Sequence, residues 1–123
     1  MEQKKILIID DEEDIRKTLS LFLERRGYGV IEAGDVIDTI KYMNKETPQI
    51  IFLDIKLPGL DGIEILKMIK HYDQDIPVIM MSGYATEDMA KESLQLGAFD
   101  YVRKPFNMDR IDSILSMVEI SKF

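Results

Sequence analysis

Five short runs of apolar, strand-favouring residues recur along the chain, and segments with helical spacing of apolar residues separate them. The runs are ILII (6–9), VIE (30–32), IIFL (50–53), PVIMM (77–81) and DYV (100–102). Two of the intervening stripes are Ile15, Leu19, Phe22 and Leu23, and Ile111, Ile114, Leu115 and Val118. Strands that alternate with helices are joined by right-handed crossovers. The pattern therefore predicts a single α/β domain in which helices cover both faces of a five-stranded parallel sheet.

Signals for helix ends agree with this division. Gly27 and Gly97 follow helical segments, where a residue in the left-handed conformation commonly ends a helix. Asp61, with Glu64 three residues later, predicts a capping box for a helix near 62–71. Further N-caps are predicted at Asp35, Thr86 and Asn107.

Length and composition limit what such a domain can do. The chain has 123 residues, enough for one substantial core. Its formal net charge of −7 argues against nucleic-acid binding by this chain alone, because phosphate backbones are met by clustered Lys and Arg. The absence of cysteine excludes disulfides, thiolate catalysis and cysteine-based zinc sites. The first apolar run is too short for a signal peptide or a membrane span, so we expect a soluble cytoplasmic protein without membrane contact.

Polar residues that can carry chemistry follow four of the five runs. They are, in chain order, Asp10 and Asp11, then Asp54, then Ser82, and finally Arg103 and Lys104. Only the second run ends without an obvious site residue. In an open parallel sheet, sites form at the carboxyl ends of the strands, which lie about 4.8 Å apart. We therefore expect three carboxylates, a hydroxyl and an ammonium group to meet in one shallow pocket.

These residue types suit phosphoryl transfer beside a hard metal ion. Three clustered carboxylates repel one another unless a cation neutralises them. An all-oxygen ligand set, with the only histidine at the distant position 71, suits Mg²⁺, for which we expect Mn²⁺ to substitute. A carboxylate can attack phosphorus and form an aspartyl phosphate. Lys104 and the Ser82 hydroxyl would then neutralise charge on the transferring oxygens.

Four ordered motifs resemble those of the receiver domain of two-component response regulators. They are IIDDEE with Asp10 and Asp11, LDIKLPGLDG with Asp54, Pro58 and Gly62, MMSGYA with Ser82, and GAFDYVRKPF with Tyr101, Lys104 and Pro105. The resemblance covers essentially the whole chain. It implies a flavodoxin-like sheet of strand order 2-1-3-4-5. It also implies a cis peptide bond between Lys104 and Pro105.

The resemblance implies a role for each matching residue. Asp54 is the expected phosphoacceptor, and the expected Mg²⁺ ligands are Asp10, Asp11, Asp54 and the backbone carbonyl of Lys56. Ser82, where the family more often has Thr, and Lys104 would contact the phosphoryl group, and Tyr101 would swing inward with Ser82. The implied donor is a sensor histidine kinase or a histidine phosphotransferase. A downstream target protein or phosphotransferase would read the surface of the fourth helix, fifth strand and fifth helix.

Two hypotheses concern residues around the pocket. Leu21 lies opposite the apolar stripe of the first helix, and we expect it to form a docking patch with Ile15 and Pro105 for a helical phosphotransfer partner. Lys56 and Tyr84 each lie two residues past a site residue. We expect their large side chains to obstruct the water that would hydrolyse the phosphoryl group.

Each motif also has a plainer interpretation when it is taken alone. The acidic run at 10–14 could be a solvated segment that opens a helix, and Asp54 could be a turn residue before Pro58. Lys104 is by itself an ordinary surface lysine, and Ser82 before Gly83 an ordinary turn residue. Their joint order on successive strand ends favours a site, because independent turn residues have no reason to converge.

Three functional classes remain open at this point. The first is a stand-alone regulator or phosphorelay intermediate, with a receiver domain over residues 1–123 and no effector domain. The second is the receiver domain of a longer DNA-binding transcription factor. The third is a nucleotide-binding enzyme on the same fold, which the lack of both G-x-G-x-x-G and G-x-x-x-x-G-K-[ST] disfavours.

Overall fold

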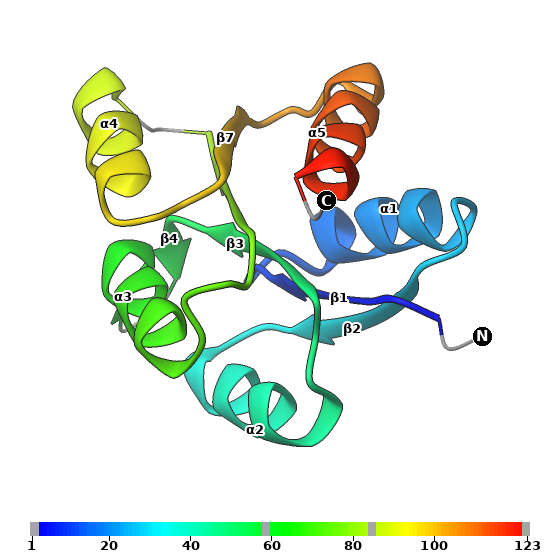
Figure 1. Ribbon diagram of the computed structural model, residues 1–123, viewed down its shortest axis with the longest axis horizontal. Helices are drawn as coiled ribbons and strands as arrows, with labels where there is room; N and C mark the ends of the chain where they lie inside the picture. The colour runs from blue at the N-terminus through cyan, green and yellow to red at the C-terminus, as the bar shows by residue number, and fades with distance from the viewer. Residues whose placement is uncertain (1–2, 58–59, 84–85, 122–123) are drawn as a thin grey trace.

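Strands and helices alternate along the chain in the computed structural model, which describes residues 3–57, 60–83 and 86–121 (Figure 1). The strands are β1 (Lys5–Ile9), β2 (Gly29–Ala33), β3 (Ile50–Asp54), β4 (Lys56–Leu57), β5 (Leu60–Asp61), β6 (Val78–Ser82) and β7 (Asp100–Arg103). The helices are α1 (Glu13–Glu24), α2 (Val36–Glu46), α3 (Gly62–Tyr72), α4 (Glu87–Gln95) and α5 (Met108–Ile120). None of the helices in these ranges is long and apolar enough to cross a membrane.

The main sheet contains five parallel strands in the order β2-β1-β3-β6-β7. These are the five predicted strands in the predicted order 2-1-3-4-5, so the flavodoxin-like fold is confirmed. The short antiparallel pair of β4 and β5 was not predicted, because two-residue strands leave no periodic pattern. Helices α1 and α5 lie on one side of the sheet, and α2, α3 and α4 lie on the other (Figure 1).

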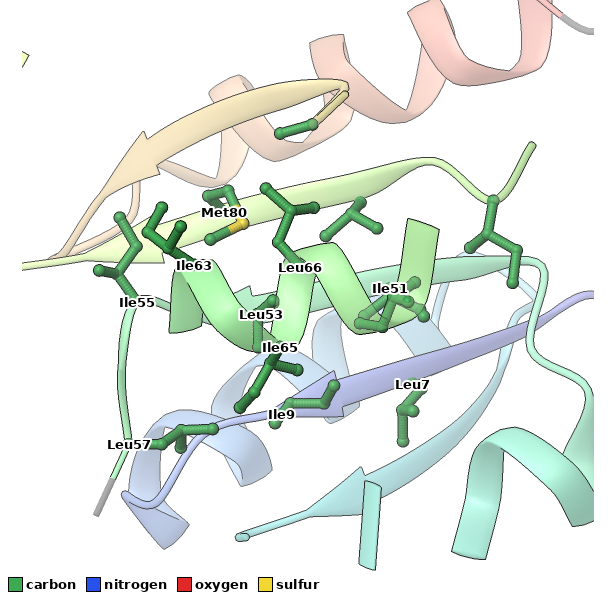
Figure 2. Close-up of a cluster of buried hydrophobic side chains, with 14 of the residues drawn as sticks. Leu7, Ile9, Ile51, Leu53, Ile55, Leu57, Ile63, Ile65, Leu66 and Met80 are labelled. Carbon is green, nitrogen blue, oxygen red and sulfur yellow. The ribbon is translucent and has the colours of Figure 1, made fainter. Parts of the chain in front are cut away.

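The core forms two layers because neighbouring residues of a strand point to opposite faces of the sheet. Leu7, Ile9 and Leu53 lie in the layer under α3, where they join Ile65 and Leu66 (Figure 2). Their neighbours along the strands belong to the layer under α1 and α5, which includes Ile6, Ile8, Phe52, Leu19 and Ile114. Strands β3 and β6 are buried along their whole length, as expected for strands that are covered on both faces.

The helix ends follow the sequence signals. Gly27 and Gly97 have positive φ angles of 91° and 103°. The predicted caps at Asp35, Asp61, Thr86 and Asn107 each accept a hydrogen bond from a backbone N–H in the first turn of the helix that follows. One helix end was not predicted. Helix α2 ends at Thr47, which has a φ of 46°, and the sequence does not signal this end because the conformation is rare for a β-branched residue.

Candidate functional site

The carboxyl ends of β1, β3, β6 and β7 border one pocket of about 480 Å³. Its lining residues are Asp11, Glu12, Ile15, Asp54, Lys56, Ser82, Gly83, Lys104 and Pro105. Asp10 is fully buried, and its carboxylate contacts Lys104. The predicted convergence of carboxylates, hydroxyl and ammonium is therefore confirmed. Arg103 instead lines a neighbouring hollow with Tyr101 and Phe106.

Asp54 is held at the pocket by both of its carboxylate oxygens. It is the last residue of β3, and its Oδ1 accepts a hydrogen bond of 3.1 Å from the backbone N–H of Lys56. Its Oδ2 accepts a hydrogen bond of 3.2 Å from Lys104 Nζ. The side chain is only 7% exposed, so a reacting group can approach it from the pocket alone.

The start of α3 packs directly against the end of β3. The Gly62 N–H donates a hydrogen bond of 2.7 Å to the Ile55 carbonyl. The Ile55 N–H donates one of 2.9 Å to the Met81 carbonyl. A Cβ atom on Gly62 would lie 2.5 Å from the backbone carbonyl oxygen of Asp54. The position therefore requires glycine, and it couples helix α3 to the backbone of the candidate phosphoacceptor.

Lys104 reaches the acidic residues from the end of β7. Its Nζ lies 2.5 Å from Asp10 Oδ2 and 3.2 Å from Asp54 Oδ2. The contact with Asp10 is an ion pair at close range in a buried position, so Lys104 is the partner of Asp10 Oδ2. The backbone N–H of Lys104 donates to Ser82 at 2.9 Å, and the Lys104–Pro105 peptide bond is cis, as predicted.

The site's electrostatics reflect crowded carboxylates with one nearby cation. Burial, and secondly the charge of Asp10, raise the pKa of Asp54 from 3.8 to about 6. The hydrogen bond from the Lys56 backbone N–H, and the charge and hydrogen bond of Lys104, oppose this rise. Burial disfavours the charged form of Lys104, but Asp10 and Asp54 outweigh it and raise the pKa of that ammonium group. In the absence of metal, Lys104 is therefore the cation that partly compensates the buried acids.

The residues present fit a hard divalent cation. Carboxylate oxygens of Asp10, Asp11 and Glu12 lie within 4.8 Å of one another. Asp10 Oδ2 is buried against Lys104, whereas Asp11 and Glu12 are exposed at the pocket mouth. An all-oxygen set of this kind suits Mg²⁺. Glu12 was not predicted as a site residue, although it is part of the acidic run at 10–14.

Comparison with known proteins identifies the family. Residues 6–116 match the response regulator receiver domain. The chain belongs to this family. Sporulation initiation phosphotransferase F of Bacillus subtilis (strain 168) is 42% identical over 111 residues, which cover 90% of each chain. Alkaline phosphatase synthesis transcriptional regulatory protein PhoP of the same strain is 41% identical over 122 residues, which cover 96% of this chain and 51% of the relative.

The structures of the family agree with the sheet order described above. The crystal structure of a CheY-like response regulator receiver domain protein from Methanospirillum hungatei JF-1 superimposes with a TM-score of 0.90 at 30% sequence identity. The superposition covers 98% of each chain. The fold of this receiver domain is therefore shared over nearly its whole length.

Ser82 and Tyr101 occupy neighbouring strands of the receiver domain. Ser82 is the last residue of β6, is 2% exposed and lines the pocket. Tyr101 on β7 is half-buried and packs against the core layer under α3. Its hydroxyl is covered and has no hydrogen-bond partner among the residues that the structure describes. The covered hydroxyl places at least the tip of the ring in the interior. The expected inward swing of Tyr101 with Ser82 stays a prediction.

The residues expected to dock a partner are only partly brought together. Ile15 and Pro105 both line the pocket rim. Leu21 is 52% exposed further along α1, and it is not one of the described residues that line the pocket. Lys56 is exposed at the pocket, as its expected role requires, whereas Pro58 and Tyr84 lie outside the described residues.

The second strand supports the pocket indirectly, although none of its residues is among the described residues that line the pocket, as predicted. Glu32 on β2 accepts a hydrogen bond of 3.2 Å from Arg16 Nε, and Arg16 also contacts the backbone of Asp10. No sequence signal marks this link, because Glu32 is a mid-strand residue and Arg16 is one of two basic residues in α1. The pairing depends on the packing of α1 against β2.

Proposed function

We propose that Asp54 accepts a phosphoryl group from a phosphohistidine on a sensor histidine kinase or a histidine phosphotransferase. The observation that carries this proposal is the position of its carboxylate, which borders the pocket between Lys104 and the acidic cluster. Belonging to the receiver domain family supports it. The protein is then a signalling switch that catalyses its own phosphorylation and dephosphorylation, and its net charge of −7 argues against direct contact with nucleic acid.

The transfer step needs a nucleophile and charge neutralisation. An Asp54 oxygen attacks phosphorus, a new P–O bond forms, and the P–N bond to the donor imidazole breaks. The electron pair of that bond stays on the imidazole nitrogen, which takes up a proton from solvent. Lys104 is within reach of Asp54 and would neutralise charge on the transferring oxygens, and the Ser82 hydroxyl faces the same pocket.

We further propose that Mg²⁺ binds at Asp10, Asp11 and Asp54, with the backbone carbonyl of Lys56 as an additional ligand and Mn²⁺ as a substitute. Glu12 is close enough to contribute, directly or through water. The ion would supply positive charge to the phosphoryl oxygens. The chain's own contribution is to hold the buried Asp10 carboxylate, which pairs with Lys104, beside exposed carboxylates, which brings the ligands together before the ion arrives.

The phosphorylated state would be read at a distance from Asp54. A phosphoryl group beside Ser82 would attract its hydroxyl and alter the packing of Tyr101 on the neighbouring strand. Tyr101 is linked to the start of α5, because Arg110 donates to Asp100 at 2.9 Å and contacts the Tyr101 carbonyl at 3.4 Å. A change at Tyr101 would therefore remodel the α4, β7 and α5 surface, where a downstream protein or phosphotransferase would dock.

Two pathway contexts are each favoured by one observation. The match over 90% of the length of a sporulation phosphotransferase favours a cytoplasmic phosphorelay intermediate, which passes its phosphoryl group onward. The match over 51% of the length of PhoP favours, as the second candidate, the receiver domain of a longer transcriptional regulator. Transfer from phosphorylated Asp54 to the histidine of a phosphotransferase distinguishes them, because only the first requires it.

The direct test is intact mass after incubation with acetyl phosphate, with Mg²⁺ in one sample and a chelator in the other. We expect an adduct of one phosphoryl group that depends on Mg²⁺ and maps to the peptide that contains Asp54. An unmodified mass in both samples, or a modification at another residue, would contradict the proposal.

Acidification should weaken Mg²⁺ binding through Asp54. Because its pKa is raised to about 6, the carboxyl group takes up a proton below that pH, and an incoming ion must displace it. We expect the dissociation constant for Mg²⁺ to rise by about tenfold for each pH unit below 6, and to change little between pH 7 and 8. Calorimetric titrations between pH 5 and 8 measure this dissociation constant. A constant affinity for Mg²⁺ over that range would exclude Asp54 as a ligand.

A further inference from the structure

Arg16 contacts the backbone that carries Asp10, although it does not reach the pocket itself. From helix α1, its Nη1 donates a hydrogen bond of 2.7 Å to the backbone carbonyl of Asp10. Its Nε donates to Glu32 Oε1 at 3.2 Å. The side chains of Arg16 and Glu32 are only 18% and 22% exposed, so this link is mostly shielded from solvent.

The contact completes a set of restraints on Asp10. The backbone N–H of Asp10 donates to the Ala33 carbonyl at 3.0 Å, and its Oδ1 accepts from the Glu12 N–H at 2.9 Å. With Arg16 on the carbonyl, three of the four polar atoms of Asp10 are fixed. The fourth, Oδ2, is buried and lies 2.5 Å from the Lys104 ammonium group. The arrangement therefore keeps one oxygen of Asp10 directed toward positive charge.

Space for the guanidinium group comes from Gly34. A Cβ atom at this position would lie 3.2 Å from Arg16 Nη1, which is tighter than ordinary packing allows without a shift of the Arg16 side chain. Strand β2 contributes an acceptor at Glu32, and Gly34, just past the end of the strand, leaves room for the same guanidinium group.

We propose that Arg16, oriented by Glu32, is a positioning residue that fixes the Asp10 backbone and thereby sets the affinity of the pocket for its divalent cation. The inference rests on the proposed function, because it assumes that Asp10 is a metal ligand. It adds to that function a support that spans α1 and β2.

Simple electrostatics makes the opposite prediction, which gives the test its power. A guanidinium group near a cation site repels the ion, so loss of its charge should tighten Mg²⁺ binding if Arg16 acts only through charge. If Arg16 acts by holding Asp10, its loss should weaken binding, because a mobile ligand costs entropy and alignment when the ion binds. Outer-shell partners of metal ligands typically contribute about 10–100-fold to affinity.

The experiment is calorimetric titration of Mg²⁺ at pH 7.5 into the wild-type protein, Arg16→Gln, Arg16→Lys and Lys17→Gln. Lys17 is the matched control, because it pairs with the same Glu32 at 3.0 Å and has the same charge but is 63% exposed. We expect binding to be about tenfold weaker in Arg16→Gln. Arg16→Lys should lose less Mg²⁺ affinity than Arg16→Gln, since its one ammonium group can reach either Asp10 or Glu32 but not both. Lys17→Gln should bind Mg²⁺ at least as tightly as wild type.

Urea unfolding without metal shows whether Arg16→Gln is folded. If it is not, two further variants still test whether Arg16 positions Asp10. Glu32→Gln removes the charge that orients Arg16, and Gly34→Ala displaces the guanidinium group without changing any charge. Both should weaken Mg²⁺ binding several-fold. Wild-type or tighter affinity in Arg16→Gln, or in both of these variants, would overturn the inference and leave the proposed function intact. Failure of the wild-type protein to bind Mg²⁺ would overturn both.

Discussion

Asp54→Asn is expected to stabilise the protein in the absence of metal, while it abolishes acceptance of the phosphoryl group. The ionised carboxylate is a liability in the native state, because it is nearly buried and lies close to Asp10. Asparagine removes that charge but keeps the Oδ1 that accepts from the Lys56 N–H. Lys104 would retain its ion pair with Asp10. An amide is not a nucleophile toward phosphorus, so the same substitution should eliminate the mass adduct.

The size and pH dependence of this effect follow from the pKa. A pKa raised in the native state from 3.8 to about 6 means that the folded protein binds more protons than the unfolded chain between these values. Stability is therefore lost as the pH rises through this window, and the full penalty is present above it. The shift, which already includes the opposing effect of Lys104, corresponds to at most about 3 kcal/mol. We expect about 1–2 kcal/mol, because solvent screens part of the unfavourable interaction.

Urea unfolding with a chelator, at pH 7.5 and at pH 4, measures the stability change caused by Asp54→Asn. Asp54→Asn should unfold at a higher urea concentration than wild type at pH 7.5, and the difference should nearly vanish at pH 4. Asp11→Asn is the control, because it changes the net charge equally at an exposed position in the same acidic cluster and should stabilise much less. Equal effects of the two substitutions would show that general charge repulsion, and not the burial of Asp54, is responsible.

Gly62→Ala is expected to cause the largest loss of stability among glycine-to-alanine substitutions at the glycines that the structure describes. The new Cβ would lie 2.5 Å from both the Asp54 carbonyl oxygen and Ile55 Cα, and 2.6 Å from the Ile55 carbonyl oxygen. All three are backbone atoms, which cannot rotate away as a side chain can. Helix α3 must therefore move off the end of β3, at a cost of about 3 kcal/mol or more.

Gly29→Ala is the matched substitution for this test. Its Cβ would meet only the side chains of Gln3 and Lys5, which can shift, and alanine is acceptable in a strand. We expect a change below about 1 kcal/mol in its free energy of unfolding. Because Gly62 touches the Asp54 backbone, Gly62→Ala should also slow phosphorylation by acetyl phosphate under conditions where the variant is still folded. Similar stabilities for the two variants would disprove the close approach of α3 to β3.

The architecture explains why these two residues are so consequential. Asp54 ends a strand that is buried along its whole length, and α3, which begins at Gly62 and covers that strand, starts close in space to the strand end (Figure 2). Only a residue without a side chain lets the helix start so close. The proposed phosphoacceptor is thereby joined to a fully buried strand, while Asp11 and Glu12 of the acidic cluster are exposed just before α1.

The order of strands and helices, most helix ends and the main site residues were predictable from the sequence. Periodicity reports which face of a segment is buried, and residues such as Gly27, Asp35 and Asn107 act on their own neighbours, so their effect can be predicted from short segments. Asp54, Ser82 and Lys104 could be grouped because the ends of parallel strands necessarily share one edge of a sheet. Their chemical roles remain proposals.

The remaining features depend on contacts between segments that are distant in the sequence. The raised pKa of Asp54 requires burial together with Asp10 and Lys104, and neither the burial nor the spacing of these groups is encoded locally. The same is true of the link from Glu32 through Arg16 to the Asp10 carbonyl, which joins three elements. The close approach that makes Gly62 irreplaceable is a matter of tenths of an ångström between backbones. Local sequence patterns thus specify the five main strands, the helices and most of the pocket residues, apart from Glu12 and Arg103, whereas the distances between these groups, and therefore their energies, arise only when the elements pack together.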